Sequence, residues 1–166
     1  MASTLTVDNI EGATSSSAIH IPGHVVQTVS YGLGQGVGTT FTNSTTVTVG
    51  SGQNVTIGSG TITPKYATSK ILVTGFNTAH NTNTGYTYMR VIRTLGGTDT
   101  IILTPGNAVG FQINSGVRMS IPVYVLDSPA TTSTITYSHR VDYHGGTVSQ
   151  MYNYGSCNLT LMEIAQ

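Results

Sequence analysis

The sequence predicts an all-β fold, a β-sandwich that forms a jelly roll of about eight strands and carries an extended N-terminal arm. Threonine is the most frequent residue, and with glycine, serine, valine, isoleucine and tyrosine it gives a composition typical of short strands and tight turns. Segments of β-type residues are separated by turn signals at intervals of roughly 8 to 15 residues. No segment shows the 3.6-residue apolar period of a helix.

Residues 1–24 differ from the rest of the chain and predict an arm. Leu5, Val7 and Ile10 form one short apolar stretch, and Ile19 and Ile21 belong to a second that ends at a Pro-Gly turn signal. So little apolar surface does not offset the entropy of ordering the segment by itself. We therefore expect residues 1–24 to dock on a neighbouring molecule and residues 25–166 to form the sandwich.

The strands begin at residue 25. The segments with β-type patterns are 25–31, 45–49, 54–57, 70–76, 86–93, 100–103, 117–126, 132–143 and 158–164. Segments 45–49 and 54–57 flank a Gly-Ser-Gly turn and predict a hairpin. Pro122 predicts an edge, a bulge or a strand start.

The connections between strands favour the jelly roll over other all-β folds. Those after Phe76 and Leu103 are too long for simple hairpins. A parallel β-helix is the other candidate, but the chain shows no fixed internal period.

Alternation along the strands also predicts the core. Leu159 and Leu161 share one face of the last strand, with Glu163 next on that face. The side chains expected to be buried are Ile71, Val73, Val91, Ile101, Val123, Val125, Ile135, Val141, Leu159 and Leu161.

Charge is scarce and balanced, with six basic and six acidic residues and a net charge of zero. Nucleic-acid binding needs clustered lysine and arginine, whereas here the basic residues are scattered, so we expect no nucleic-acid partner. Near-zero net charge favours association. The N-terminus lacks the pattern of a secretory signal, and no apolar run has the length of a membrane helix.

Four histidines occur as two pairs, but the pairs do not predict a metal site within one chain. His139 and His144 are five residues apart and face opposite sides of a continuous strand. A three-fold axis could instead gather His20 or His24 from three chains, although surface or interface roles suit both better. We therefore expect no metal and no cofactor.

The sequence does not predict an enzyme. Ser138, His139 and Asp142 lie close together, but catalytic triads are defined by geometry, and the G-x-S-x-G elbow is missing. The glycine-rich segment 32–38 lacks both the spacing and the following helix of a phosphate-binding loop. We assign no catalytic residue.

Tyrosine is the one aromatic residue that gathers near a potential surface. The loop expected at 143–154 carries Tyr143, His144, Tyr152, Asn153 and Tyr154. Tyrosine combines apolar area with a hydroxyl group, which suits contact with a partner protein or a glycan. Packing at strand ends is the other interpretation.

Several segments, in order along the chain, resemble β-rich virion structural and tail-fibre-like proteins of marine and cyanobacterial tailed phages. They are STLTVDNIEGAT at 3–14, GHVVQTV at 23–29, ITPKYATSKILVTG at 62–75, LDSPATTSTITYSHRV at 126–141 and NLTLMEIAQ at 158–166. The resemblance implies a trimeric protein on the exterior of the particle, made in the host cytoplasm and in contact with other capsid or tail proteins. It supplies no catalytic residues.

The chain lacks the long repetitive shaft of a reaching fibre. It therefore suits a capsid decoration (cement) subunit or a short tail fibre or spike. The alternative function is a receptor-binding adhesin that recognises host surface glycans.

Overall fold

The computed structural model describes residues 22–32, 47–49, 54–80, 85–103, 110–113, 118–144, 149–151 and 157–166. Within these residues the secondary structure consists of strands. They are β1 (Val25–Gly32), β2 (Val47–Val49), β3 (Asn54–Ile62), β4 (Lys70–His80), β5 (Gly85–Leu95), β6 (Thr98–Leu103), β7 (Gly110–Ile113), β8 (Arg118–Asp127), β9 (Ile135–His144), β10 (Ser149–Met151) and β11 (Cys157–Ile164). None of these segments is a helix long and apolar enough to span a membrane.

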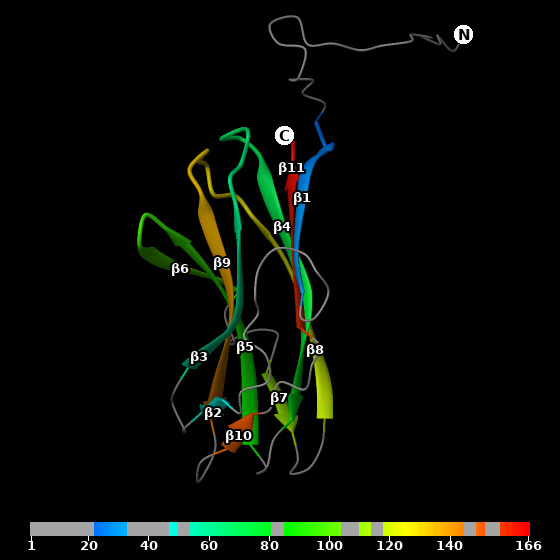
Figure 1. The fold of residues 1–166 in the computed structure, drawn as a ribbon, viewed down its shortest axis with the longest axis vertical. Helices are drawn as coiled ribbons and strands as arrows, with labels where there is room; N and C mark the ends of the chain where they lie inside the picture. The colour runs from blue at the N-terminus through cyan, green and yellow to red at the C-terminus, as the bar shows by residue number, and fades with distance from the viewer. Residues whose placement is uncertain are drawn as a thin grey trace, which may run out of the picture.

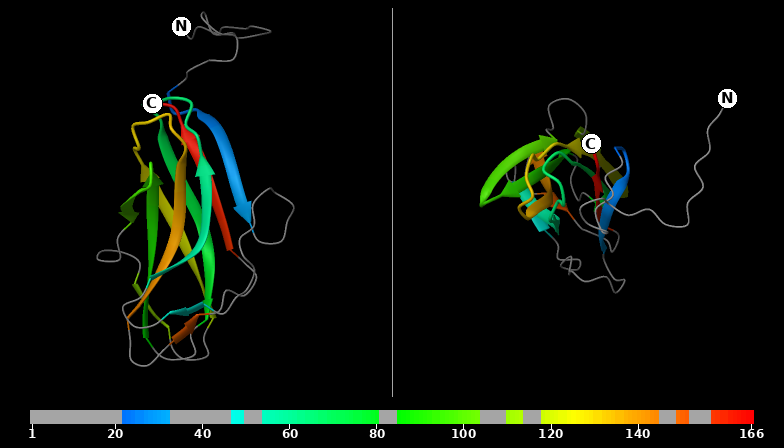
Figure 2. Two further views of the ribbon diagram at one scale, coloured as in Figure 1. Left: turned by 60° about the vertical axis from the view of Figure 1, so that its left-hand side comes forward. Right: turned by 90° about the horizontal axis from the view of Figure 1, so that it is seen from above.

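Most of the strands form two facing antiparallel sheets, as Figures 1 and 2 show, and β2 and β10 pair as a separate two-stranded sheet. The first sheet has the order β1-β11-β4-β8 and the second β3-β9-β5-β6, with β7 also paired to β5. When the short strands β2, β7 and β10 are set aside, the first sheet holds the first, eighth, third and sixth strands, and the second sheet holds the second, seventh, fourth and fifth. This order is that of a jelly roll, so the predicted fold class is confirmed.

The predicted hairpin between residues 45–49 and 54–57 is wrong. β2 pairs with β10, and β3 pairs with β9 along most of its length, from Asn54 opposite Asp142 to Ile62 opposite Ile135. Alternation identified both segments as strands, but it carries no information about partners. β9 is the better partner for β3 because the pairing is long and closes one side of the second sheet.

The prediction made from Pro122 agrees with the structure, and a glycine pair shapes the turn between β5 and β6. Pro122 lies in β8, which is an edge strand of the first sheet and tolerates a residue without an N–H group. The turn between β5 and β6 contains Gly96 and Gly97, both with positive φ (57° and 81°). Glycine adopts this conformation without steric cost, and two such residues in succession match the right-handed twist of a hairpin.

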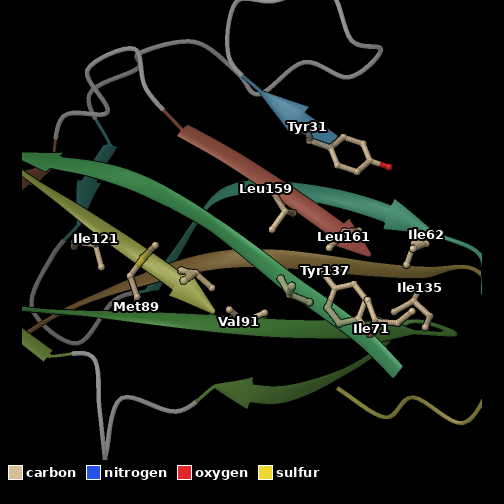
Figure 3. Packing of buried hydrophobic residues seen from close by; sticks show 12 residues of the cluster. Tyr31, Ile62, Ile71, Met89, Val91, Ile121, Ile135, Tyr137, Leu159 and Leu161 are labelled. Carbon is tan, nitrogen blue, oxygen red and sulfur yellow. The ribbon is translucent and has the colours of Figure 1, made fainter. Parts of the chain in front are cut away.

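The core lies between the two sheets (Figure 3). Seven of the predicted core side chains are buried: Ile71, Val73, Val91, Val123, Ile135, Leu159 and Leu161. Val125 is partly buried, and the side chain of Val141 lies outside the described residues. Glu163 is fully buried on the same face as Leu159 and Leu161, as the alternation predicts.

The prediction for Ile101 is wrong, since its side chain is 45% exposed. The pairing of β5 with β6 shifts register between Val91 and Ile92: Leu103 lies opposite the core residue Val91, whereas Ile101 lies opposite Ile92, which alternates to the other face of β5 and is itself covered there. A shift of one residue moves a side chain to the other face of a sheet. The sequence pattern of β6 gives no sign of this bulge.

Tyr31 is a core residue that alternation alone did not identify. Its ring covers Gly60, where a Cβ atom would lie only 2.3 Å from the ring. Its hydroxyl donates to the carbonyl oxygen of Thr61 and accepts from the amide of Thr61, at 2.9 Å in the second case. Tyr31 belongs to β1 and Gly60 to β3, so this contact joins the two sheets along one side of the sandwich.

A pair of isoleucine variants tests the placement of the core. Ile71→Ala should lower the free energy of unfolding by roughly 2–4 kcal/mol because it leaves a cavity between the sheets. Ile101→Ala makes the same chemical change on the outer surface and should cost clearly less. Chemical denaturation of both variants measures the difference, and equal losses would contradict the assigned strand faces.

Candidate functional site

The residues predicted to contact a partner or a glycan lie largely outside the described part of the chain. Tyr152, Asn153 and Tyr154 are outside it, as are the side chains of Tyr143 and His144. The predicted loop is not a single loop: Tyr143 and His144 end β9, opposite Thr87 and Tyr86 of β5, and Ser149–Met151 form β10. Pairing with β5 extends β9 beyond the point where its sequence pattern ends.

The arm residues Leu5, Val7, Ile10, Ile19 and Ile21 also lie outside the described residues, together with His20. The described chain starts at the predicted turn, where Gly23 has a φ of 81°. The amide of Gly23 donates to the carbonyl oxygen of Ala165 (2.8 Å), and the amide of Ala165 donates to the carbonyl oxygen of His24 (2.9 Å). The described chain therefore begins directly beside the end of β11.

Glu163 is the most deeply embedded acidic group of the described residues. One of its oxygens accepts from the backbone amides of Lys65 (2.8 Å) and Tyr66 (3.1 Å), and the other accepts from the side-chain amide of Gln27 (2.6 Å). Burial alone would raise the pKa of this carboxyl, but the hydrogen bonds, those from Lys65 and Gln27 foremost, lower it below its ordinary value. Glu163 is therefore an ionised structural anchor.

A second polar cluster joins the two sheets at Asp127. The Arg93 Nη1 atom lies 3.0 Å from each carboxylate oxygen of Asp127, and the Tyr137 hydroxyl donates to Oδ2 at 2.7 Å. Burial, and after it the bond to Asp127, raises the pKa of Tyr137, so its phenol stays protonated and donating. Asp127 belongs to the first sheet, and Arg93 and Tyr137 belong to the second. The cluster therefore fastens one sheet to the other.

His139 is a buried residue of the sandwich interior. Its side chain is fully buried, and Cε1 lies 3.2 Å from the position that a Cβ atom on Gly75 would take. Neither ring nitrogen has a hydrogen-bond partner among the described residues. Burial lowers the pKa of the imidazole to about 4, so the ring is neutral at pH 7.

The histidine therefore does not form the arrangement that a triad would need, because within the described residues no serine or carboxylate bonds to it. The same residues contain no group of three histidine, cysteine, aspartate or glutamate side chains that could hold a metal ion. The interior polar groups described above therefore support the sandwich.

The outer surface of the second sheet carries most of the described surface charge. Arg140 Nη2 contacts Asp99 Oδ2 at 2.6 Å, and Thr94 donates to Asp99 Oδ1 at 2.6 Å. The bonds from Thr94 and Arg140 lower the pKa of the Asp99 carboxyl. Arg90 lies opposite Arg140 in the register of β5 and β9 and adds a second guanidinium to this surface.

The outer surface of the first sheet has a different composition, and we call it the uncharged face. Its described side chains are Val25, Thr28 and Ser30 of β1; Asn158, Thr160, Met162 and Ile164 of β11; Lys70, Leu72, Thr74 and Phe76 of β4; and Ser120, Pro122, Tyr124 and Leu126 of β8. Lys70, at one end of β4, is the one charged residue among them. Tyr124 is 72% exposed and Leu126 49% exposed. In the sequence, these residues occupy the alternate positions of each strand that do not face the core. Only the sheet order shows that the four sets of residues are neighbours.

One variant tests the role assigned to Glu163. Glu163→Gln removes the charge and places an amide donor among the donors from Lys65, Tyr66 and Gln27. We expect the free energy of unfolding to fall by about 3 kcal/mol, because buried donors lose a charged acceptor. Asp99→Asn, at the exposed carboxyl of the second sheet, is the control and should change stability far less. Equal effects in denaturant titrations would show that Glu163 is not an anchor.

A second variant tests the buried state of His139 through the pH dependence of stability. Between about pH 6.5 and pH 4 the unfolded chain binds a proton at this residue that the folded chain does not. The free energy of unfolding should therefore fall as pH is lowered through this range, by about 3 kcal/mol for this residue. His139→Leu has no group that binds a proton at this position, so it lacks this contribution to the pH dependence. The difference in stability between the two proteins should shift by that amount from pH 7 to pH 4, and parallel pH curves would contradict a buried neutral imidazole.

Comparison with known proteins finds similar folds but identifies no function. No family model and no curated protein matches the sequence. The chain is similar in structure to the capsid protein in a T13 viral particle of infectious bursal disease virus, with a TM-score of 0.54, 14% identity, and coverage of 85% of this chain and 32% of that one. It is also similar to VP2 in a subviral particle of the same virus, with a TM-score of 0.55, 13% identity, and coverage of 85% and 33%. The chain thus spans about a third of the length of these capsid proteins, and what the likeness shows is a common sandwich fold.

Proposed function

We propose that this protein is a non-enzymatic structural subunit of a virion. The observation that carries the proposal is the strand order of its two sheets, which forms a jelly roll similar to a domain of viral capsid proteins. Jelly rolls also occur in other proteins. The proposal therefore also rests on the composition of this chain and on its sequence resemblance to phage virion proteins.

The interior chemistry supports an assembly role rather than catalysis. Glu163 and Asp127 each bind several donors of their own chain, and His139 is enclosed between the sheets. Groups used in this way are not free to act on a substrate. The function we infer is therefore carried by surfaces.

We assign the protein more specifically to the exterior of a tailed-phage particle, as a homotrimeric capsid decoration (cement) subunit or a short tail fibre or spike. This assignment rests on the ordered sequence resemblance and on the small share of charged residues, 7% of the chain, which suits a permanently assembled protein. Residues 1–24 are the proposed docking arm toward the particle or a sister chain.

Two measurements test the proposal. Light scattering on the purified chain should give about three times its mass of 17.4 kDa. Quantitative mass spectrometry and electron microscopy of purified particles should find the chain on the exterior, in copy numbers divisible by three. A chain that is absent from washed particles would contradict the virion role, and a monomer at all concentrations would contradict the trimer.

A further inference from the structure

The outer side of β6 has no paired strand within the described residues. β6 ends the strand order of the second sheet, and its residues 98–101 are exposed. The register shift beside Val91 makes Ile102 a bulge, so residues 98–101 are the regular part of the strand. The N–H and C=O groups on the free side of such a strand form a template for one more strand.

The other three edges of the two sheets are less suited to accept a strand. β1 and β3 lie against each other, because the ring of Tyr31 covers Gly60. β8 carries Pro122, which pairs with Phe76 of β4. The Phe76 amide donates to the Asn158 side chain on the β11 side, so the backbone of Pro122 faces the free edge of β8, where it lacks a donor. β6 contains no proline.

The N-terminal arm contains a segment whose pattern matches β6. In residues 4–7, of sequence TLTV, threonine alternates with Leu5 and Val7. In the regular part of β6, threonines at 98 and 100 alternate with Asp99 and Ile101, and Ile101 is 45% exposed. If the two segments pair, one apolar residue of the arm lies beside Ile101 and threonine lies beside threonine. Both are favourable pairs between neighbouring strands.

The starting point and length of the arm allow it to reach β6 of an adjacent copy. The described chain begins at residue 22, on the side of the sandwich formed by β1 and β3, whereas β6 lies on the other side next to β8. Figure 2 shows β1 (blue) and the hairpin of β5 and β6 (green) on opposite sides. Residues 8–21 can span up to about 46 Å, and a four-stranded sheet is only about 15 Å wide. Ile19 and Ile21 lie too close to residue 22 to reach so far.

Charge and symmetry favour a sister copy as the donor of this strand. Residues 1–24 contain Asp8 and Glu11 but no lysine or arginine, so their net charge is −2, and residues 25–166, with six basic and four acidic residues, have a net charge of +2. Opposite charges steer the two parts together. A ring of three copies needs two different patches on every copy. An arm on one side and an acceptor edge on the other meet this need, whereas pairing of β6 with β6 would join only two copies.

We propose that residues 4–7 of one copy add as a strand to β6 of a neighbouring copy. The proposal rests on the trimer proposed above and names the segment and the edge that join its subunits. The added strand covers Ile101 and provides partners for the free backbone groups of residues 98–101.

Disulfide cross-linking between two co-expressed full-length chains tests the pairing. One chain carries Val7→Cys and the other, distinguished by a size tag, carries Ile101→Cys, both with Cys157→Ser so that each chain has a single cysteine. Leu5→Cys replaces Val7→Cys in a second pair, because either residue can lie opposite Ile101. The matched control acceptor is Tyr124→Cys, at a 72% exposed position of β8, the other edge strand on that side. We expect one arm position to cross-link to Ile101→Cys roughly tenfold more than to Tyr124→Cys, since a disulfide requires Cα atoms within about 7 Å.

Light scattering of cysteine-unaltered proteins provides an independent measurement. Leu5→Asp with Val7→Asp places two charges in the added strand, and Ser15→Asp with Ser17→Asp adds the same charges at the same spacing in the connecting segment. We expect the first variant to raise the concentration at which half of the chains are trimeric by roughly tenfold or more, and the second to leave it near that of the parent. Far-UV circular dichroism establishes that each variant is folded.

The remaining outcomes separate this proposal from the trimer on which it rests. A parent trimer that keeps its mass in the Leu5–Val7 variant and yields no cross-link to Ile101→Cys would overturn the strand addition and leave the trimer intact. A cross-link that forms only when both cysteines are in one chain would show that the arm binds its own β6. Cross-linking of Ile101→Cys chains to one another would show pairing of β6 with β6, and either result would overturn the exchange. A parent that is monomeric at all concentrations would overturn the trimer itself.

Discussion

The buried carboxylate of Glu163 fixes the place where the chain passes from one sheet to the other. The connection between β3 and β4 contains Lys65 and Tyr66, whose amides both donate to this carboxylate. Gln27 of β1 binds the same carboxylate and also donates to the carbonyl oxygen of Thr63 at 2.7 Å. One side chain of β11 therefore positions an edge strand and a crossover, and the jelly-roll order depends on that crossover.

Two tyrosines with specific hydrogen bonds also join the two sheets. Tyr31 joins β1 to β3, and Tyr137 joins β9 to β8 through Asp127. Both tyrosines fill space between the sheets with their rings and satisfy their hydroxyls at the margin of the core. The charges that remain on the surface are placed unevenly, with the Arg140–Asp99 pair on the second sheet and only Lys70 among the described side chains of the uncharged face.

The sequence predicted what depends on local patterns. Alternation gave the β-rich class, most strand positions, and the burial of Glu163 beside Leu161, because strand geometry has a period of two residues. It did not give the partner of β3, the bulge that exposes Ile101, or the extension of β9 through His144. These depend on pairings between segments distant in the chain, which local propensity does not encode. The sequence did not predict the uncharged face for the same reason. Its residues occupy alternate positions in four separate strands, and only the sheet order brings them together.

The bonds between Gly23, His24 and Ala165 place both ends of the sandwich at one corner, beside the first pair of β1 and β11, Val25 and Ile164. A tensile load applied between residue 22 and residue 166 would pull these two antiparallel strands apart from their shared end. The hydrogen bonds between such strands run perpendicular to the strands, so they would break one after another rather than all at once. The isolated sandwich should therefore resist force weakly along this direction, and a protein that bears mechanical load would need that corner held by its neighbours.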